Sequence, residues 1–193
     1  MEMPLFPLNT VLFPDGLLPL RIFEPRYLDM VGESLRTGSG FGVVLIAGGG
    51  EVGGDARFHP FGTVARIIDF DRLEDGLLGI TCQGGERFRV LDHRQRADRL
   101  VIAEVELLPA EPRLAVPADC ALAVRLLRSV LSLDEVQVIA RRLRMDWDSA
   151  SWVGFRLADL LPLPLAAKQS LLEAADPLQR LQELQAVIRT YAR

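Results

Sequence analysis

The stretch MPLFPLNTVLFPDGLLPLRIFEPRYLDMV, residues 3–31, decides the fold of this chain. Its apolar runs are short and end at prolines. The first run lies between Pro4 and Pro7, and the second ends at Pro14. Because proline has no backbone N–H to donate, such runs are typical of edge strands and bends rather than of central strands. The first half of the stretch therefore predicts short β-structure at an edge.

The second half of the stretch predicts a turn, a strand and a helix in that order. Asp15-Gly16 suits a turn, and Leu17 to Phe23 is a second extended run. Pro25 suits the first turn of a helix, and Gly38 suits its end. Apolar side chains recur at i, i+4 and i+8, at Tyr27, Val31 and Leu35. We expect a helix over Pro25–Thr37.

Two segments of this stretch resemble a known family. They are PLFPLNTVLFP at residues 4–14 and PLRIFEPRY at residues 19–27. Both closely resemble the start of the N-terminal domain of the Lon (La) ATP-dependent proteases. The likeness continues in later segments: FGVVLI at 41–46, GTVARIIDF at 62–70, GERFRV at 85–90, Trp152-Val153, and Asp176-Pro177 with its leucines. The resemblance therefore covers nearly the whole chain.

The first part of the chain is rich in predicted strands. Phe41 to Ala47 is a continuous apolar run, and Asp75-Gly76 is a strong hairpin signal between two further runs. Val101 to Leu107 alternates between apolar and polar residues. Many short strands with glycine and proline turns favour a small, partly closed barrel. The Lon resemblance implies the same: a PUA-like β pseudo-barrel with one inserted helix, at Pro25–Thr37.

The second part of the chain is predicted to be helical. Three prolines in PAEPRLAVP, Pro109 to Pro117, make a stiff connector. Beyond it the apolar residues follow a helical period, and Val116 to Arg193 predicts a bundle of four or five helices. The predicted fold class is α+β. We expect a β-rich PUA-like subdomain over 1–112 and a helical-bundle subdomain over 113–193, both within one Lon N-terminal domain.

Composition limits the cellular setting. A hydrophobic content of 49% allows a substantial core. No apolar run approaches the roughly 18–20 residues that a membrane helix needs, and the N-terminus has no basic cluster typical of a secretory signal. The two cysteines, Cys82 and Cys120, lie in apolar surroundings and are interpreted as buried free thiols. These features predict a cytoplasmic protein that has no membrane partner.

Charge opposes a general role in nucleic-acid binding. The formal net charge is −4 and the isoelectric point is about 5.3. Binding of nucleic-acid phosphates depends on clustered positive charge, which this balance does not favour. Nucleic acid is therefore an unlikely partner.

The residues that a full Lon protease needs for its chemistry are not found in the sequence. The phosphate-binding pattern requires glycines and a Gly-Lys pair, but the only lysine, Lys168, follows Ala166-Ala167. Lys168 and Ser170 are two residues apart, so on a helix they would point away from each other. His59 and His93 have no metal-like spacing to other ligands. We expect no catalytic residue, cofactor or metal, and therefore no enzyme.

Two further clusters are candidate sites. The glycines of Gly48 to Gly54 follow a strand but lack a lysine, so a mobile hairpin loop is favoured over a phosphate site. Asp69 with Asp71, or Glu74 with Asp75, could form an acid/base pair. These four residues bracket the predicted hairpin turn, where acidic residues normally solvate the chain.

The resemblance implies a substrate-recognition and assembly domain that stands alone, and its residues give the candidate site. The candidate polypeptide-binding residues are Leu17, Leu20, Arg21, Phe23, Glu24, Arg26 and Tyr27. We expect some of them to line an apolar groove where the barrel meets the helices. A purely structural interpretation places Glu24 at the positive N-terminus of its helix, Tyr27 in the core and the arginines on the surface.

Three functions follow as hypotheses. The first is binding of unfolded or flexible polypeptide, as an adaptor or holdase with a protease or chaperone component as a further partner. The second is an accessory component of an ATP-dependent protease system that acts with a separate motor and peptidase. The third is RNA binding through the PUA-like barrel, which the acidic balance disfavours.

Overall fold

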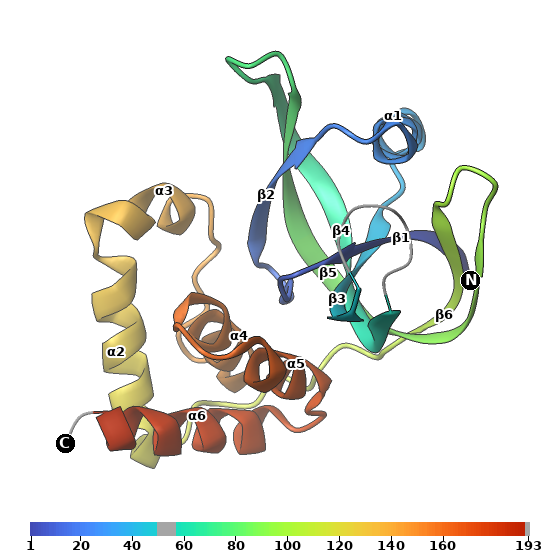
Figure 1. Ribbon diagram of the computed structural model, residues 1–193. Coiled ribbons are helices and arrows are strands. Elements are labelled where there is room, and N and C mark those ends of the chain that lie inside the picture. The colour runs from blue at the N-terminus through green and yellow to red at the C-terminus, as the bar shows by residue number, and fades with distance from the viewer. Residues whose placement is uncertain (50–56, 192–193) are drawn as a thin grey trace. The chain divides into compact units, whose positions relative to one another are not determined.

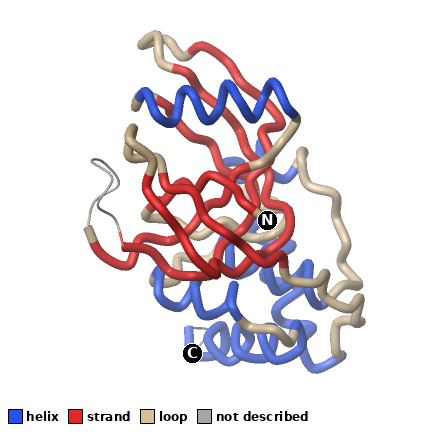
Figure 2. Tube along the Cα trace, turned by 90° about the vertical axis from the view of Figure 1, so that its right-hand side faces the viewer, coloured by secondary structure: helices blue, strands red, loops and turns tan. Residues whose placement is uncertain are grey.

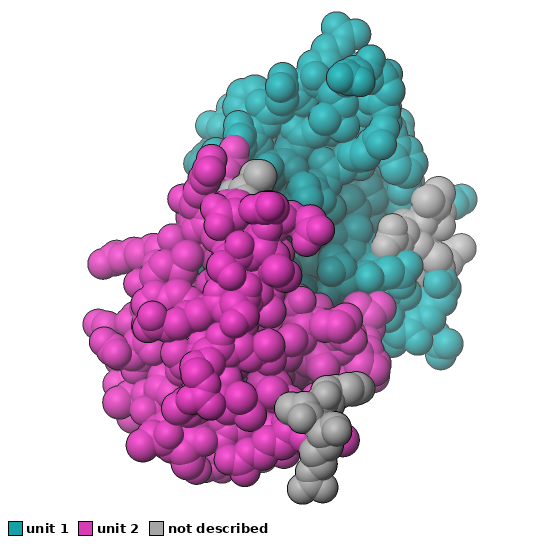
Figure 3. Space-filling model, turned by 90° about the vertical axis from the view of Figure 1, so that its left-hand side faces the viewer, with its two compact units in different colours: residues 1–109 teal, residues 110–193 magenta. Residues whose placement is uncertain are grey.

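The structure, a computed structural model, describes residues 1–49 and 57–191. The fold is α+β, as the sequence predicts, with a six-stranded sheet and a set of helices (Figure 1). The chain divides into two compact units, residues 1–109 and 110–193, which are coloured separately in Figure 3. This division lies close to the predicted boundary between 112 and 113. Strands dominate the first unit and helices the second (Figure 2).

The first unit contains the sheet and one inserted helix. Its elements are β1 (Glu2–Leu8), β2 (Leu17–Ile22), α1 (Pro25–Thr37), β3 (Phe41–Gly48), β4 (Arg57–Arg72), β5 (Leu78–Gln95) and β6 (Val101–Leu107). The strand order is β2-β5-β4-β3-β1-β6, and β6 also pairs with β5. The strands from β5 round to β6 therefore close into a ring. Strand β2 pairs with the first residues of β5, and β6 pairs with the later ones. Only β1 and β3 among these pairs run parallel.

Strand β1 corrects one sequence-based expectation. Its prolines predicted an edge strand, yet β1 lies between β3 and β6 in the sheet. The reason is that each half of the strand pairs on one side only. Glu2–Leu5 pairs with β6, whereas Leu5–Leu8 pairs with β3. Pro4 and Pro7 thus lie in different halves, so neither proline has to be hydrogen-bonded on both sides.

The inserted helix α1 crosses the neighbouring strands (Figure 2), and its buried residues belong to the larger core cluster. This helix runs over the predicted residues, and its C-terminal cap is Gly38 with a left-handed φ of 69°. Its buried face supplies apolar side chains that pack with those of several strands. The cluster includes Phe6, Ile22, Tyr27, Met30, Val31, Phe41, Ile80, Cys82 and Leu100. Packing against the sheet therefore fixes the helix that follows β2.

The β4–β5 hairpin is longer than the sequence suggests. Short separate strands were expected, but β5 is continuous from Leu78 to Gln95. The predicted turn is present, with Gly76 at a φ of 84° and its N–H donating to the carbonyl of Leu73 at 2.8 Å. The end of the hairpin projects beyond the ring of strands (Figure 1), where β2 pairs with the first residues of β5. This end carries the surface discussed below.

The second unit is helical. Its helices are α2 (Ala121–Leu131), α3 (Gln137–Ala140), α4 (Ala150–Leu160), α5 (Leu165–Glu173) and α6 (Pro177–Tyr191), with short 3₁₀ turns at Ala118–Cys120 and Asp134–Val136. Ser149 caps α4 by accepting a hydrogen bond from the N–H of Trp152 at 3.3 Å. Asp176 accepts from the N–H of Leu178 at 2.8 Å at the start of α6. The 3₁₀ turn Asp134–Val136 has Leu133 as its N-cap residue and no side-chain cap bond.

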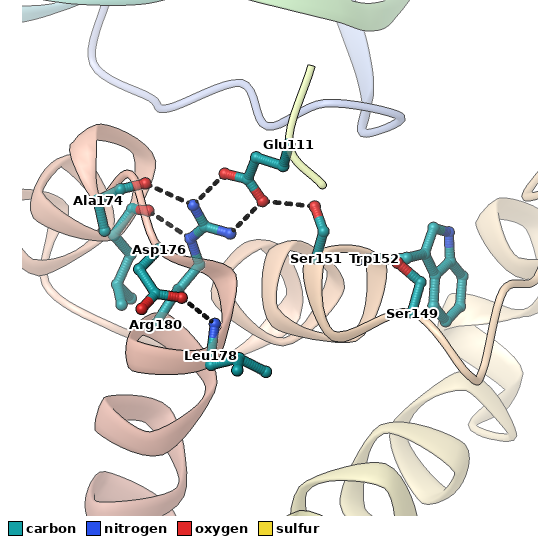
Figure 4. A network of polar contacts seen from close by, with 9 residues as sticks. Glu111, Ser149, Ser151, Trp152, Ala174, Asp176, Leu178 and Arg180 are labelled. Atoms are coloured by element: carbon teal, nitrogen blue, oxygen red, sulfur yellow. Dashed lines mark hydrogen bonds and ion pairs between the residues drawn. The ribbon is translucent and has the colours of Figure 1, made fainter. Parts of the chain in front are cut away.

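A buried polar network anchors the start of this unit to its last helices (Figure 4). The Arg180 guanidinium donates to the Glu111 carboxylate and to the carbonyls of Leu171 and Ala174. Glu111 also accepts a hydrogen bond from the Ser151 hydroxyl at 2.6 Å. The network therefore ties the residues just after Pro109 to α4 and α6.

Candidate functional site

Two of the predicted binding residues belong to the core. Tyr27 is 5% exposed, and its ring stacks on that of Phe6 at a centroid distance of 3.9 Å. Arg26 is 6% exposed, and its guanidinium lies 4.5 Å from the centre of the Tyr27 ring. The same guanidinium donates to the carbonyl of Arg99 at 3.0 Å. The expectation that the arginines lie on the surface is therefore wrong for Arg26, because Tyr27 and Arg99 hold its charged head inside.

Glu24 completes this buried arrangement. It is the N-cap residue of α1, but its carboxylate makes no cap hydrogen bond. Instead an oxygen of Glu24 lies 2.8 Å from a terminal nitrogen of Arg26. A buried charge is stable only when it is paired, and this carboxylate supplies the pairing. Glu24, Arg26 and Tyr27 therefore position the start of α1 against the sheet.

The other predicted residues lie at the surface of β2 and just after it. Alternate residues of a strand face opposite sides. Leu18 and Leu20 are partly buried and pack against the edge of the core cluster. Leu17 is half-buried, Arg21 is exposed, and Phe23 is 56% exposed. The structure thus separates the seven candidates into a buried group around α1 and a surface group along β2.

A hollow of about 780 Å³ lies beside β2 and the end of the β4–β5 hairpin. It is lined by Pro19, Leu20, Arg21, Asp69, Phe70, Asp71, Leu73, Glu74, Asp75, Gly79, Ile80 and Thr81. Two of the predicted residues, Leu20 and Arg21, are among them. The hollow thus combines residues from β2, from the end of β4, from the start of β5 and from the hairpin turn.

Strand pairing explains how these residues come together. In one row across the three strands, Pro19 pairs with Thr81, and Thr81 pairs with Asp69. In the next row, Arg21 pairs with Gly79, and Gly79 pairs with Asp71. Paired residues on neighbouring strands point to the same side of a sheet. The two rows therefore bring side chains from distant parts of the sequence to one face.

The hollow is acidic. Its carboxylates belong to Asp69, Asp71, Glu74 and Asp75, whereas Arg21 is its only cationic side chain. The guanidinium of Arg21 forms an ion pair with Asp75. The lining therefore holds four carboxylates and one guanidinium. The surface is therefore suited to a cationic ligand rather than to a phosphate.

The comparison with protein families identifies the fold. The family model of the ATP-dependent protease La (LON) substrate-binding domain matches residues 2–190. The chain belongs to this family. The sequence resemblance to the Lon proteases is thereby confirmed over nearly the whole chain.

Solved structures and curated relatives agree with the assignment to the Lon substrate-binding domain family. A Lon N-terminal domain protein from Xanthomonas campestris is 39% identical, with a TM-score of 0.79 over 96% of this chain and 98% of that one. The N-terminal domain of a Mycobacterium avium complex Lon protease is 18% identical, with a TM-score of 0.66 over 95% and 96% of the two chains, and shows the same fold. Lon protease 2 of Myxococcus xanthus is 28% identical over 179 residues, which are 90% of this chain but 22% of that protease.

Lys168 and Ser170, the candidate catalytic pair of the sequence, make separate local contacts. The Lys168 ammonium donates to the carbonyl of Asp159 at 2.6 Å, and burial lowers the pKa of this lysine from its ordinary value. The Ser170 hydroxyl donates instead to the carbonyl of Ala166 at 3.1 Å, within its own helix. No group of histidine, cysteine or carboxylate residues that could hold a metal occurs in the described part of the chain. Most of the glycine cluster at Gly48 to Gly54 lies outside the described residues.

The helices of the described residues include none that is long and apolar enough to cross a membrane.

On sequence grounds, the acidic residues of the hollow are interpreted as solvating a turn. The sequence does contain a pattern that indicates their shared position. Asp69 and Asp71 are two residues apart on one strand, so their side chains lie on the same face of the sheet. Their proximity to Arg21 depends on the register of three strands, which that pattern alone does not give.

Proposed function

We propose that the chain is a recognition module that binds unfolded or flexible polypeptide through β2 and the neighbouring end of the β4–β5 hairpin. The observation that carries the proposal is an edge strand beside an open hollow in a member of the Lon substrate-binding domain family. Among the described residues, β2 pairs with β5 alone, so its other edge is open. Leu17, Leu20, Arg21 and Phe23 are the predicted residues that this surface retains.

An open strand edge offers a defined mode of binding. An extended polypeptide can add to such an edge through backbone hydrogen bonds, while alternate side chains enter neighbouring pockets. Pro19 lies within β2 and has no N–H to donate. A bound strand would therefore make fewer hydrogen bonds than it would on an ordinary edge, and edge-to-edge aggregation is also restrained. These features favour weak binding that tolerates many sequences.

The proposed role involves no chemistry of the chain's own. Lys168 and Ser170, the residues that a Lon-type peptidase would need as base and nucleophile, make separate contacts within the helical unit. A nucleophile and its base have to lie within hydrogen-bond reach of each other in order to react. We therefore propose that the chain recognises polypeptide without cleaving it and without hydrolysing nucleotide.

A second candidate is an accessory role in an ATP-dependent protease system. It is favoured by one observation: the family model of the ATP-dependent protease La (LON) substrate-binding domain matches residues 2–190. In this role the recognition surface would deliver polypeptide to a separate motor and peptidase. RNA binding receives no support from the hollow, because its four carboxylates would repel phosphate.

The proposal can be tested by direct binding. A fluorescent, reduced and alkylated polypeptide that stays unfolded is titrated with the native protein while anisotropy is recorded. Leu17→Asp and Phe23→Asp should weaken binding, whereas Gln182→Asp, which adds the same charge at an exposed position of α6, should not. Thermal unfolding is measured for each variant. The proposal fails if no binding appears at high micromolar protein, or if every variant that weakens binding also unfolds the protein.

A further inference from the structure

We propose that the acidic hollow beside β2 selects polypeptide segments that carry lysine or arginine side chains. This inference rests on the proposed function and adds the chemical class of segment that the surface prefers. It concerns the small sheet formed by β2, the start of β5 and the end of β4. Figure 1 shows this part of the first unit at the projecting end of the hairpin.

The small sheet has two open edges in the described structure. One is the outer edge of β2, which pairs only with β5. The other belongs to the end of β4, because β4 pairs with β3 as far as Ala65, whereas it pairs with β5 as far as Arg72. An extended segment can therefore lie beside the hollow with its backbone along a strand. Its alternate side chains would then face the same side as Asp69 and Asp71.

The shape of the hollow suits a long side chain. Gly79 lies on β5, the middle of the three strands, and a Cβ atom at this position would come 2.8 Å from Cδ2 of Leu73. The glycine therefore lets Leu73 of the turn lie over the sheet as an apolar wall. The volume of about 780 Å³ exceeds the space that one lysine or arginine side chain occupies. The apolar stem of such a side chain could lie on Leu73 and Pro19 while its charged end reaches the carboxylates.

The charge of the hollow determines which polypeptide segment it binds. Asp75 already pairs with Arg21, but the hollow keeps an excess of negative charge after that pairing. Asp71 and Asp75 each accept a hydrogen bond from a nearby backbone N–H, of Arg72 at 2.7 Å and of Leu77 at 3.1 Å. These bonds orient the carboxylates without neutralising them. A cationic segment is thus attracted, and an acidic segment is repelled at the same place.

The test compares three fluorescent peptides that differ only in charge. All three are extended and share the same apolar residues, and two central positions are lysine, glutamine or glutamate. We expect the lysine peptide to bind about tenfold more tightly than the glutamate peptide at low salt, with the glutamine peptide between them. The difference should shrink at high salt, because these charges are exposed and their interaction is screened.

Variants of the hollow test whether its carboxylates cause the preference for the lysine peptide. The double substitution Asp69→Asn with Asp71→Asn should abolish the preference for the lysine peptide over the glutamate peptide. Glu74→Gln, at an exposed turn position, should reduce the preference in the same direction with less risk to the fold. Asp29→Asn removes an exposed carboxylate from α1 of the same unit and should have no effect.

The outcomes separate the two proposals. If the three peptides bind equally, or if the preference for lysine survives both hollow variants, the inference is wrong while polypeptide recognition stands. If neither the peptides nor the unfolded polypeptide bind, the proposed function fails together with the inference.

Discussion

Arg180 and Glu111 form a buried ion pair between residues that are 69 positions apart in the sequence (Figure 4). The side chain of Arg180 is 0% exposed and that of Glu111 is 6% exposed. Arg180 also donates to the carbonyl of Leu171 at 2.8 Å, and its guanidinium lies 3.9 Å from the centre of the Phe155 ring. A guanidinium with this many partners holds one geometry. The pair therefore specifies how the segment after Pro109 joins the helices.

Breaking this pair should destabilise the helical unit strongly. Glu111→Ala leaves the guanidinium of Arg180 buried and without its counter-charge, and such a loss costs about 3–5 kcal/mol of the free energy of unfolding. The control is Arg113→Ala, which removes a side chain that is 74% exposed from its ion pair with Asp146. That change should cost less than about 1 kcal/mol. Urea denaturation followed by circular dichroism measures both, and equal losses would contradict the structural role.

The two aromatic candidates near α1 should behave in opposite ways. Tyr27→Ala removes a buried ring that stacks on Phe6, and it should cost about 3–5 kcal/mol of stability, as truncation of a core aromatic residue does. Phe23→Ala removes a ring that is 56% exposed, and the loss should stay within about 0.5 kcal/mol. Phe23→Ala should instead weaken polypeptide binding. A large stability loss from Phe23→Ala would place this residue in the core.

Both cysteines should resist labelling in the native protein. Cys82 lies in the first unit and Cys120 in the second, and both are 0% exposed free thiols. Burial raises the pKa of both thiols, which keeps the reactive thiolate scarce. Iodoacetamide at pH about 8 should therefore modify neither thiol until urea unfolds the unit that contains it. Mass spectrometry of peptides identifies the site, and rapid labelling of either cysteine without denaturant would contradict its burial.

Local signals explain the parts of the fold that could be predicted from the sequence. The turn at Asp15-Gly16, the proline at the start of α1 and the glycine at its end each act within a few residues. The observed helix, Pro25–Thr37, therefore has the predicted bounds. The caps of α4 and α6, at Ser149 and Asp176, likewise depend on residues close in the sequence.

Features that depend on distant partners could not be predicted in the same way. Arg26 was expected at the surface because arginine is usually exposed. Its burial depends on the carbonyl of Arg99, 73 positions away, and on the stacking of Tyr27 with Phe6. The acidic hollow likewise requires the register that brings β2, β4 and β5 together. The seven predicted residues all lie in one segment, Leu17 to Tyr27, so they include core residues and omit the carboxylates of the hairpin.

The Cys82 thiol should also make the first unit sensitive to alkaline pH. Burial raises the pKa of this thiol from 9.0 to about 12 in the folded protein. Between these values the unfolded chain loses the thiol proton while the folded chain keeps it, so ionisation favours the unfolded state. The stability that the neutral thiol contributes is full below pH 9.0 and is lost as the pH rises towards about 12. Cys82→Ala removes this titration.

The measurement is therefore a difference between two proteins. The free energy of unfolding is determined by urea denaturation in steps from neutral pH to the alkaline limit of the folded state, for the native sequence and for Cys82→Ala. The variant starts less stable, because it leaves a small cavity in the core. Its deficit should narrow steadily above pH 9.0, since only the native sequence loses stability through this thiol. A deficit for Cys82→Ala that stays constant above pH 9.0 would show that the thiol is not buried as described.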